Sequence, residues 1–353
     1  MSSRKRDMIG SEVINKEAWE KFSAMGLPTR KNEHYRYVRL PTFSFEKGVG
    51  NFEVHNAAEG VLVLPFPKAQ ALFGALLQSR FERWLRHEKD PFACLNGAIC
   101  EEERVLYVPP GVQAKEMRID HSGDGGLLVT RLHFYVGKGA ELSITLSQKG
   151  KSANRFLDFT LEEGARVEVK MAECAEQQID TVRASLKRDS YFKSVNCVKG
   201  CPFLRQDYAV SLLGESSYAE LYGVCELEGT EQAHTNALVE HIAPNTASSQ
   251  KFKGVVDGKG RTSFEGKIYV HPQAQQTNAY QMSNYLVLSP KATANSKPNL
   301  EIFADDVKAS HGATVGQIDS EHLFYLQSRG IAKEEARRLL IQGFVQEIYD
   351  HLS

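Results

Sequence analysis

Apolar and polar residues alternate over short runs in the middle of the chain. Every second residue is apolar from Leu132 to Val136 and, after a turn at 137–140, again from Leu142 to Leu146. Successive side chains of a β-strand point to opposite faces, so this alternation is typical of strands with one buried face. We therefore predict strands rather than helices from about residue 100 onward.

The alternation repeats at an interval of 25 residues. Residues 157–161 and 167–171 reproduce the two runs. Ala165 likewise reproduces the turn residue Ala140, and a weaker third copy begins at Val182. A fixed repeat indicates stacked units, and strands without intervening helices favour a β-solenoid, whereas a β-sandwich gives no reason for an in-register repeat. Turns between later strands are expected at four prolines: Pro244, Pro272, Pro290 and Pro298.

Both ends of the chain show helical periodicity instead. Asn15 can cap a first helix that Gly26 ends, and its apolar face is formed by Ala18, Trp19, Phe22 and Met25. A second helix is expected from Pro67, with Pro91 past its end. Its apolar stripe comprises Leu72, Phe73, Leu76, Leu77, Phe81, Trp84 and Leu85.

The last 35 residues predict two more helices. Asp319 or Ser320 can cap the first, EHLFYLQSR, and Ala332 stands as a poor cap before the second. The second has apolar residues at steps of four: Ala336, Leu340, Phe344, Ile348 and Leu352. Because both helices carry more apolar surface than one face needs, they are candidates for docking a partner.

These patterns predict a mainly β fold, with a right-handed parallel β-helix core flanked by N-terminal and C-terminal α-helical regions. The expected divisions are an N-terminal helical region at 1–95, a β-helix core at 96–318 and a C-terminal helical region at 319–353.

Composition narrows the function. The formal net charge is −1, so a general nucleic-acid binder is not expected. No apolar run is long enough for a membrane span, and no apolar signal region opens the chain. We therefore expect a cytoplasmic protein without membrane partners. In a reducing compartment its six cysteines should be free thiols.

Catalytic signatures are missing from the sequence. It contains no GxxxxGK[ST] phosphate loop, no GxSxG elbow and no GxGxxG after a strand. A β-helix enzyme acting on carbohydrate would need clustered carboxylates, and the acidic runs are Glu101–Glu103 and Asp305–Asp306. Both runs resemble solvated turns.

His311 is the most distinctive polar candidate. It lies in the segment DDVKASHGATVGQI at 305–318, which follows an apolar strand. The segment is either a turn that requires small side chains or a site at which the imidazole binds a metal or moves a proton. His234 and His241 are expected to have hydrogen-bonded structural roles, and His271, before Pro272, is expected at a turn.

Segments at both ends of the chain resemble the SufB/SufD family of the SUF iron–sulfur cluster assembly machinery. They are AWEKFSAMGLPTRKNEHYRYVRL near the start and NLEIFADDVKASHGATVGQIDSEHLFYLQSRGIAKEEARRLL near the end. The segment TNAYQMSNYLVLSPKATANSKP is similar too. The GLPTR stretch and the modest length favour the SufD branch over SufB.

The resemblance implies a non-catalytic subunit of the SufBCD complex, which supports de novo cluster assembly. Such a subunit pairs with SufB through the β-helices and carries the SufC ATPase on its C-terminal helices. ATP binding by SufC would strain the SufB interface and expose the place where the cluster is built. No cofactor is expected to be tightly bound in the isolated chain, whereas iron or an iron–sulfur cluster is expected transiently in the complex.

The resemblance also implies site residues. His311 matches the histidine of the family's SHGAT motif, a candidate iron or cluster ligand at the SufB interface. Many relatives have cysteine two residues earlier, where this chain has Ala309, so a thiolate ligand is unavailable there. The run expected to face SufC comprises Leu323, Phe324, Tyr325, Arg329, Gly330 and Ile331, for which packing between the two helices is the alternative.

Two other functions stay open at this point. One is the carbohydrate-active β-helix enzyme, which predicts a carboxylate-lined groove. The other is a structural homodimer that stacks β-helices edge to edge.

Overall fold

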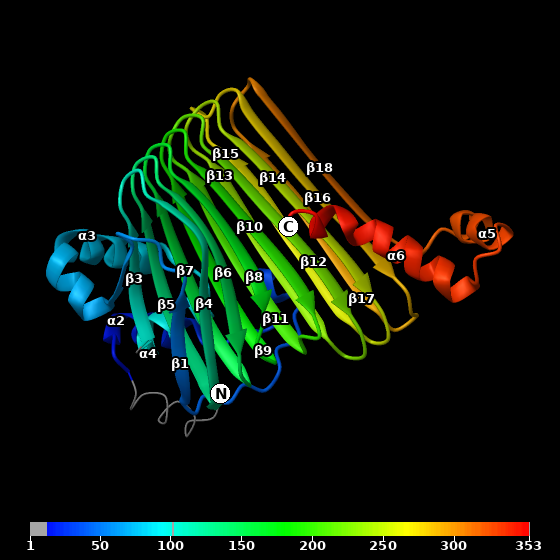
Figure 1. Cartoon of the computed structure of the whole chain (residues 1–353), viewed down its shortest axis with the longest axis horizontal. Coiled ribbons are helices and arrows are strands. Elements are labelled where there is room, and N and C mark those ends of the chain that lie inside the picture. Colours follow the sequence, from blue (N-terminus) through cyan, green and yellow to red (C-terminus); the bar gives the residue numbers. More distant parts are fainter. Residues whose placement is uncertain (1–12, 101, 353) are drawn as a thin grey trace.

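A computed structural model describes residues 13–100 and 102–352, apart from the side chains of residues 75–83. The chain winds between two nine-stranded sheets and forms a parallel β-solenoid with helices at both ends (Figure 1). The predicted mainly β fold is therefore confirmed.

The even sheet, named for its mostly even-numbered strands, runs in the order β1 (Gly48–His55), β4 (Gln113–Gly125), β6 (Glu141–Lys149), β8 (Arg166–Glu173), β10 (Tyr191–Lys199), β12 (Tyr218–Leu227), β14 (Ala247–Val256), β16 (Thr277–Val287) and β18 (Val307–Gly316). The odd sheet runs in the order β17 (Thr293–Ile302), β15 (Arg261–Val270), β13 (Gln232–His241), β11 (Phe203–Leu212), β9 (Gln177–Leu186), β7 (Ser152–Leu161), β5 (Leu127–Val136), β3 (Glu102–Val108) and β2 (Leu62–Pro65). All neighbours are parallel except β1 with β4 and β2 with β3.

The 25-residue repeat corresponds to one turn of the solenoid. Leu132 of β5 lies in register with Leu157 of β7, and Leu157 lies in register with Val182 of β9. Later turns are longer, and the offset reaches 32 residues between Arg261 of β15 and Thr293 of β17. In-register stacking places like residues above one another, which is why the first turns show a repeat.

The apolar residues of both sheets meet in one core between them. Phe159 of β7 is fully buried there, with its ring stacked on Phe134 at 4.4 Å and tilted against Phe192 at 5.2 Å. These three aromatic side chains link three successive turns of the solenoid.

Substitution of Phe159 by alanine is expected to lower the free energy of unfolding by about 3–5 kcal/mol, because it leaves a cavity between the rings of Phe134 and Phe192. Urea unfolding of the full chain measures this change. A loss below about 1 kcal/mol would show that the aromatic stack does not stabilise the solenoid.

The N-terminal region covers the outer face of the odd sheet. Its helices are α2 (Lys16–Met25), the short 3-10 helix η1 (Glu33–Tyr35), α3 (Phe66–His87) and α4 (Pro91–Ile99). As predicted, Asn15 caps α2 by accepting a hydrogen bond from Ala18 N at 2.9 Å, and Gly26 ends it with a φ of 68°. Phe22, Phe43 and Phe92 pack together against Ile179 and Phe203 of the sheet.

Helix α4 was not predicted, and Pro91 begins it rather than merely following α3. Asp90 caps α4 by accepting hydrogen bonds from Phe92 N and Ala93 N, and proline suits the first turn because its missing N–H would be unpaired anyway. The helix is buried nearly all round, so it shows no amphipathic period.

The predicted apolar stripe of α3 is interrupted. The helix is kinked at Phe73, whose φ is −129°, and Leu72 is 60% exposed. Leu85 is buried, whereas the side chains of Leu76, Leu77 and Phe81 lie outside the described residues.

The C-terminal helices are α5 (Ser320–Ser328) and α6 (Lys333–Tyr349). Asp319 caps α5, and no side chain caps α6 at Ala332, as expected. Helix α6 lies across the outer face of the even sheet, while α5 stands beyond it (Figure 1). Among the described helices, none combines the length and apolar character that crossing a membrane requires.

Two local predictions are wrong. Pro298 does not lie in a turn but inside β17, an edge strand, where a missing N–H is tolerated because that side of the strand is unpaired. Cys174 and Cys201 form a disulfide rather than staying free, because the solenoid brings residues 27 apart in sequence to a Cα–Cα distance of 6.3 Å. The other four cysteines are free.

Candidate functional site

The segment that contains His311 is a strand and not a turn, which was one of the two alternatives that the sequence left open. Residues 307–316 form β18, the last strand of the even sheet, and the acidic pair Asp305–Asp306 occupies the bend before it. Small side chains suit this strand because most of them are exposed at an uncovered end of the solenoid. One edge of β18 bonds to β16, and no strand of the described residues pairs with its other edge, called the open edge below.

His311 lies on the face of β18 that continues the interior of the solenoid. It is in register with Gln281 of β16, which is in register with Gln250 of β14, and both glutamines are fully buried. In-register residues of parallel strands share one face, so the exposed imidazole stands at the open end of the interior.

This chain supplies a single histidine at that end and no complete metal site. Within the described residues, no three His, Cys, Asp or Glu side chains gather into a group that could hold a metal ion. Ala309, two residues before His311 and on the same face, packs beside buried alanines and offers no ligand. A metal bound at His311 would therefore need ligands from a second chain.

The two terminal edges differ in their capacity to pair with another strand. In β17, Pro298 removes one N–H donor from the edge, a feature that disfavours strand addition. In β18, residues 307–316 include no proline, so every peptide retains its N–H. The edge beside His311 is therefore the better template for a partner strand.

Helix α5 exposes the aromatic residues predicted to face a partner. Phe324 and Tyr325 are 72% and 56% exposed, and α5 has no buried residue. Arg329 lies over the Tyr325 ring at 5.3 Å, and Gly330 takes a φ of 86° that favours glycine after a helix. Leu323 and Ile331 are half-buried. Packing between the helices therefore leaves the aromatic side chains uncovered.

Helix α6, in contrast, is anchored firmly on the even sheet. Val345 and Ile348 are buried against the sheet residues of the same apolar cluster. Glu347 pairs with Lys251 at 2.6 Å and Lys253 at 2.8 Å, and hydrogen bonds from these lysines lower the pKa of Glu347 to about 2. The anchored α6 thus holds α5 at a fixed end of the molecule.

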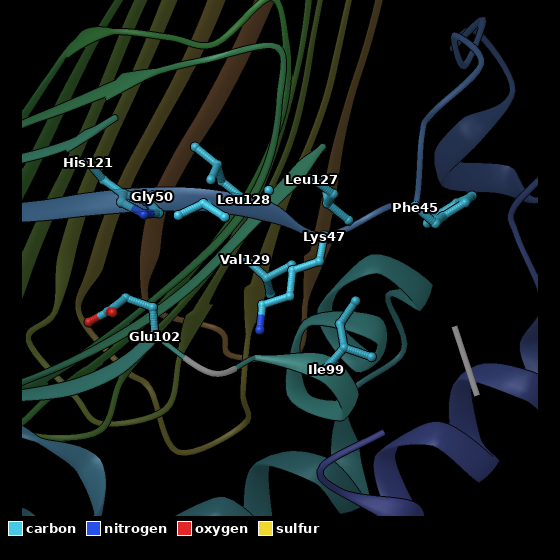
Figure 2. A pocket seen from close by; sticks show the side chains of 11 residues that line it. Phe45, Lys47, Gly50, Ile99, Glu102, His121, Leu127, Leu128 and Val129 are labelled. Carbon is cyan, nitrogen blue, oxygen red and sulfur yellow. The ribbon is translucent and has the colours of Figure 1, made fainter. Parts of the chain in front are cut away.

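A cavity of about 420 Å³ lies at the other end of the solenoid, beside β1 and the start of β5 (Figure 2). Its lining is mostly apolar, with Lys47, Glu102 and His121 as polar members. Glu102 pairs with Arg104 at 2.5 Å, and burial lowers the pKa of His121. The cavity shows no pair of groups set up for acid–base catalysis.

A larger cavity of about 700 Å³ lies between the N-terminal region and the outer face of the odd sheet. Carboxylates line it, as a carbohydrate-active enzyme would require. Cations already pair with several of them, whereas Glu240 accepts a hydrogen bond from Ser211 Oγ at 3.3 Å. Arg183 lies 2.9 Å from Glu88 and 2.8 Å from Asp207, and Lys297 lies 3.0 Å from Glu265.

The remaining acidic candidates are also engaged in structure. Desolvation raises the pKa of Asp90 to about 6, yet this carboxylate is buried and caps α4. Glu103 lies 2.8 Å from His133, while Glu101 lies outside the described residues. The described carboxylates Glu88, Asp90, Glu103, Asp207 and Glu265 therefore do not offer the carbohydrate-active alternative a free acid–base pair.

His234 and His241 have the structural roles that the sequence predicts. His234 Nδ1 contacts Ser263 Oγ at 2.7 Å, and burial lowers the pKa of His234 to about 3. His241 bridges Thr246 and Ser248, each at 2.8 Å, and burial lowers its pKa to about 4.

Replacement of His241 by asparagine should destabilise the chain less at pH 5 than at pH 7. The unfolded chain takes up a proton near pH 6.5, but the folded chain does so only near pH 4, so stability falls as pH drops through this window. The gap between wild type and variant should shrink by about 2 kcal/mol in urea unfolding. An unchanged gap would show that His241 is not held neutral.

The fold and the open end define a class of protein: a parallel β-solenoid whose last strand, β18, presents a proline-free edge beside a projecting helix. Residues 118–344 match the family model described as SUF system FeS cluster assembly, SufBD core domain. The chain belongs to this SufBD family of iron–sulfur cluster assembly proteins.

Individual relatives agree with this assignment. Protein ABCI7, chloroplastic, of Arabidopsis thaliana is 33% identical over 284 residues, which cover 74% of this chain and 59% of that protein. Iron-sulfur cluster assembly protein SufD of Escherichia coli is 31% identical over 261 residues, 70% of this chain and 59% of that protein. A Synechocystis SufBD family protein is 23% identical over 375 residues, which cover 99% of this chain and 77% of that protein. The chain thus spans less than two thirds of the first two relatives.

Proposed function

We propose that this chain is a non-catalytic, cytoplasmic subunit of a SufBCD complex and supports iron–sulfur cluster assembly at an interface with SufB. The observation that carries the proposal is the open edge of β18 with His311 at the end of the interior. An edge strand with all its donors is a template for strand addition from a second solenoid.

In this proposal, iron or a nascent cluster is the cargo, and His311 is one of its ligands. A lone imidazole binds weakly, so the ligands missing from this chain would come from SufB. The isolated chain would accordingly hold no tightly bound cofactor, and the cluster would be present transiently in the complex. The absence of a thiolate at Ala309 leaves His311 as this chain's contribution.

The SufC ATPase would dock on α5 and gate the interface. Phe324 and Tyr325 present an aromatic surface of the kind that dominates binding energy at protein interfaces. Only residues 317–319 separate β18 from α5, so displacement of α5 on ATP binding would pull directly on the edge strand.

Co-expression with SufB and SufC tests the assignment. A tag on this chain is expected to recover all three proteins as one species in size-exclusion chromatography. Recovery of this chain alone, or as a dimer that excludes SufB, would overturn the proposal, and the dimer would support the structural homodimer instead.

A further inference from the structure

A histidine and a glutamine lie in register near both ends of the even sheet. Near the start, His121 of β4 pairs with Gln148 of β6, and at the open end Gln281 of β16 pairs with His311 of β18. In the first pair, His121 Nδ1 lies 3.2 Å from Gln148 Oε1 and 2.6 Å from Thr130 Oγ1. The same sheet therefore shows that this register brings Nδ1 of a histidine to the amide oxygen of a glutamine.

Gln281 has a buried acceptor without a partner. Its Nε2 donates to Gln250 Oε1 at 3.1 Å, whereas its Oε1 has no hydrogen-bond partner among the described residues. An unpaired buried acceptor costs about 1–3 kcal/mol. The adjacent β18 position in register with this amide is that of His311.

The amide of Gln281 is also held in place from across the interior. Gly266 of β15 faces it so closely that an added Cβ would lie 2.3 Å from Gln281 Nε2. Glycine therefore makes room both for the Gln281 amide and for the Phe264 ring, which an added Cβ would approach to 2.6 Å.

We propose that Gln281 is a positioning residue for His311: Gln281 Oε1 accepts a hydrogen bond from His311 Nδ1–H and leaves Nε2 free to bind metal. The structure shows no hydrogen bond between the two side chains, and rotation of the exposed His311 ring is needed to form it. Parallel strands lie about 4.8 Å apart, so this rotation suffices.

The consequence concerns the tautomer of the ring. A metal-binding histidine usually donates its other N–H to a neighbouring acceptor, which fixes the tautomer and the ring orientation. The inference rests on the proposed role of His311 as a ligand, but the pairing itself is a property of this chain alone.

The test is ¹⁵N NMR of the full chain labelled at histidine, at a pH where the spectra show a neutral His311 ring. His311→Asn assigns the signals. Wild type is expected to hold His311 mainly in the Nδ1–H form, and Gln281→Met should shift it to the Nε2–H form. Gln281→Glu, which keeps an acceptor, should retain Nδ1–H.

Gln148→Met is the matched control, because it removes an equally buried glutamine from the other end of the same sheet. It should alter the signals of His121 and leave those of His311 unchanged. A His311 tautomer that is the same in wild type and Gln281→Met would overturn the inference, and so would a wild-type ring in the Nε2–H form.

The link to cluster assembly is tested separately in the reconstituted complex. Gln281→Met should lower cluster yield about 10-fold, as expected for a group that supports a metal ligand. If His311→Ala lowers the yield but Gln281→Met changes neither tautomer nor yield, the positioning role fails and the ligand role stands. If the tautomer responds to Gln281 but His311→Ala leaves the yield unchanged, the positioning role stands and the proposed role of His311 as a ligand fails.

Discussion

Substitution of His311 by alanine is expected to lower the yield of reconstituted cluster at least about 10-fold while the complex with SufB and SufC stays intact. Within the described strand β18, the imidazole is the metal-binding side chain on the interior face, since Ala309 supplies none. The measurement combines this chain with SufB, SufC, iron and sulfide, and follows visible absorbance together with bound iron and sulfide.

The matched control is His55→Ala. His55 is also a partly exposed histidine on an edge strand of the even sheet, but it lies on β1 at the opposite end. Its removal should leave cluster yield unchanged. Equal yields from wild type and His311→Ala would reject ligation by His311, and loss of the complex itself would assign the residue to assembly instead.

Substitution of Phe324 by alanine is expected to weaken binding of the SufC ATPase about 30-fold or more. The side chain is 72% exposed on a helix without buried residues, and truncation of an aromatic residue at an interface hot spot costs about 2 kcal/mol or more. Calorimetric titration of the full chain with SufC measures this change.

The free energy of unfolding of Phe324→Ala shows whether this side chain docks SufC or packs within this chain. Removal of an exposed side chain should change the free energy of unfolding by no more than about 0.5 kcal/mol. Leu72→Ala, which truncates an apolar residue 60% exposed on the distant α3, serves as the control and should bind SufC normally. Unchanged binding by Phe324→Ala, or a large loss of its own stability, would contradict docking on α5.

The solenoid was predictable from its first turns, and its later turns were not, because the turn chemistry changes. One turn position takes a left-handed φ in seven successive rungs. Its first three residues are glycines and the next four are polar residues: Gly111, Gly139, Gly164, Asp189, Ser216, Asn245 and Gln276. Of these residues, only glycine clearly predicts a left-handed φ from sequence. The number of residues per turn also increases where the glycines end, so the 25-residue repeat is lost there too.

Other elements were missed because a local sequence pattern does not show which distant segments pack against it. Helix α4 has no polar face, since the odd sheet and α2 bury it from opposite sides. Pro298 was expected in a turn because nothing in its neighbourhood shows that β17 is an edge strand. Strand β1 lies in a region predicted as helical, and its antiparallel pairing with β4 depends on contacts about 70 residues away in sequence.

The candidate site also contains residues that the sequence predicts and residues that it does not. His311 could be singled out from its unusual polar segment and from the family resemblance. Gln281 could not, because the two residues stand 30 apart, an offset that the 25-residue repeat does not reveal. The exposure of α5 was suggested by surplus apolar residues, but only the structure shows that α6 alone is anchored.

Hydrogen exchange of β18 tests the central claim most directly. Amides of residues 307–316 that point to the open edge should exchange rapidly in the isolated chain and become strongly protected when SufB is added, while those of β17 near Pro298 change less. Exchange in β18 that stays equally fast with SufB bound would contradict pairing at this edge.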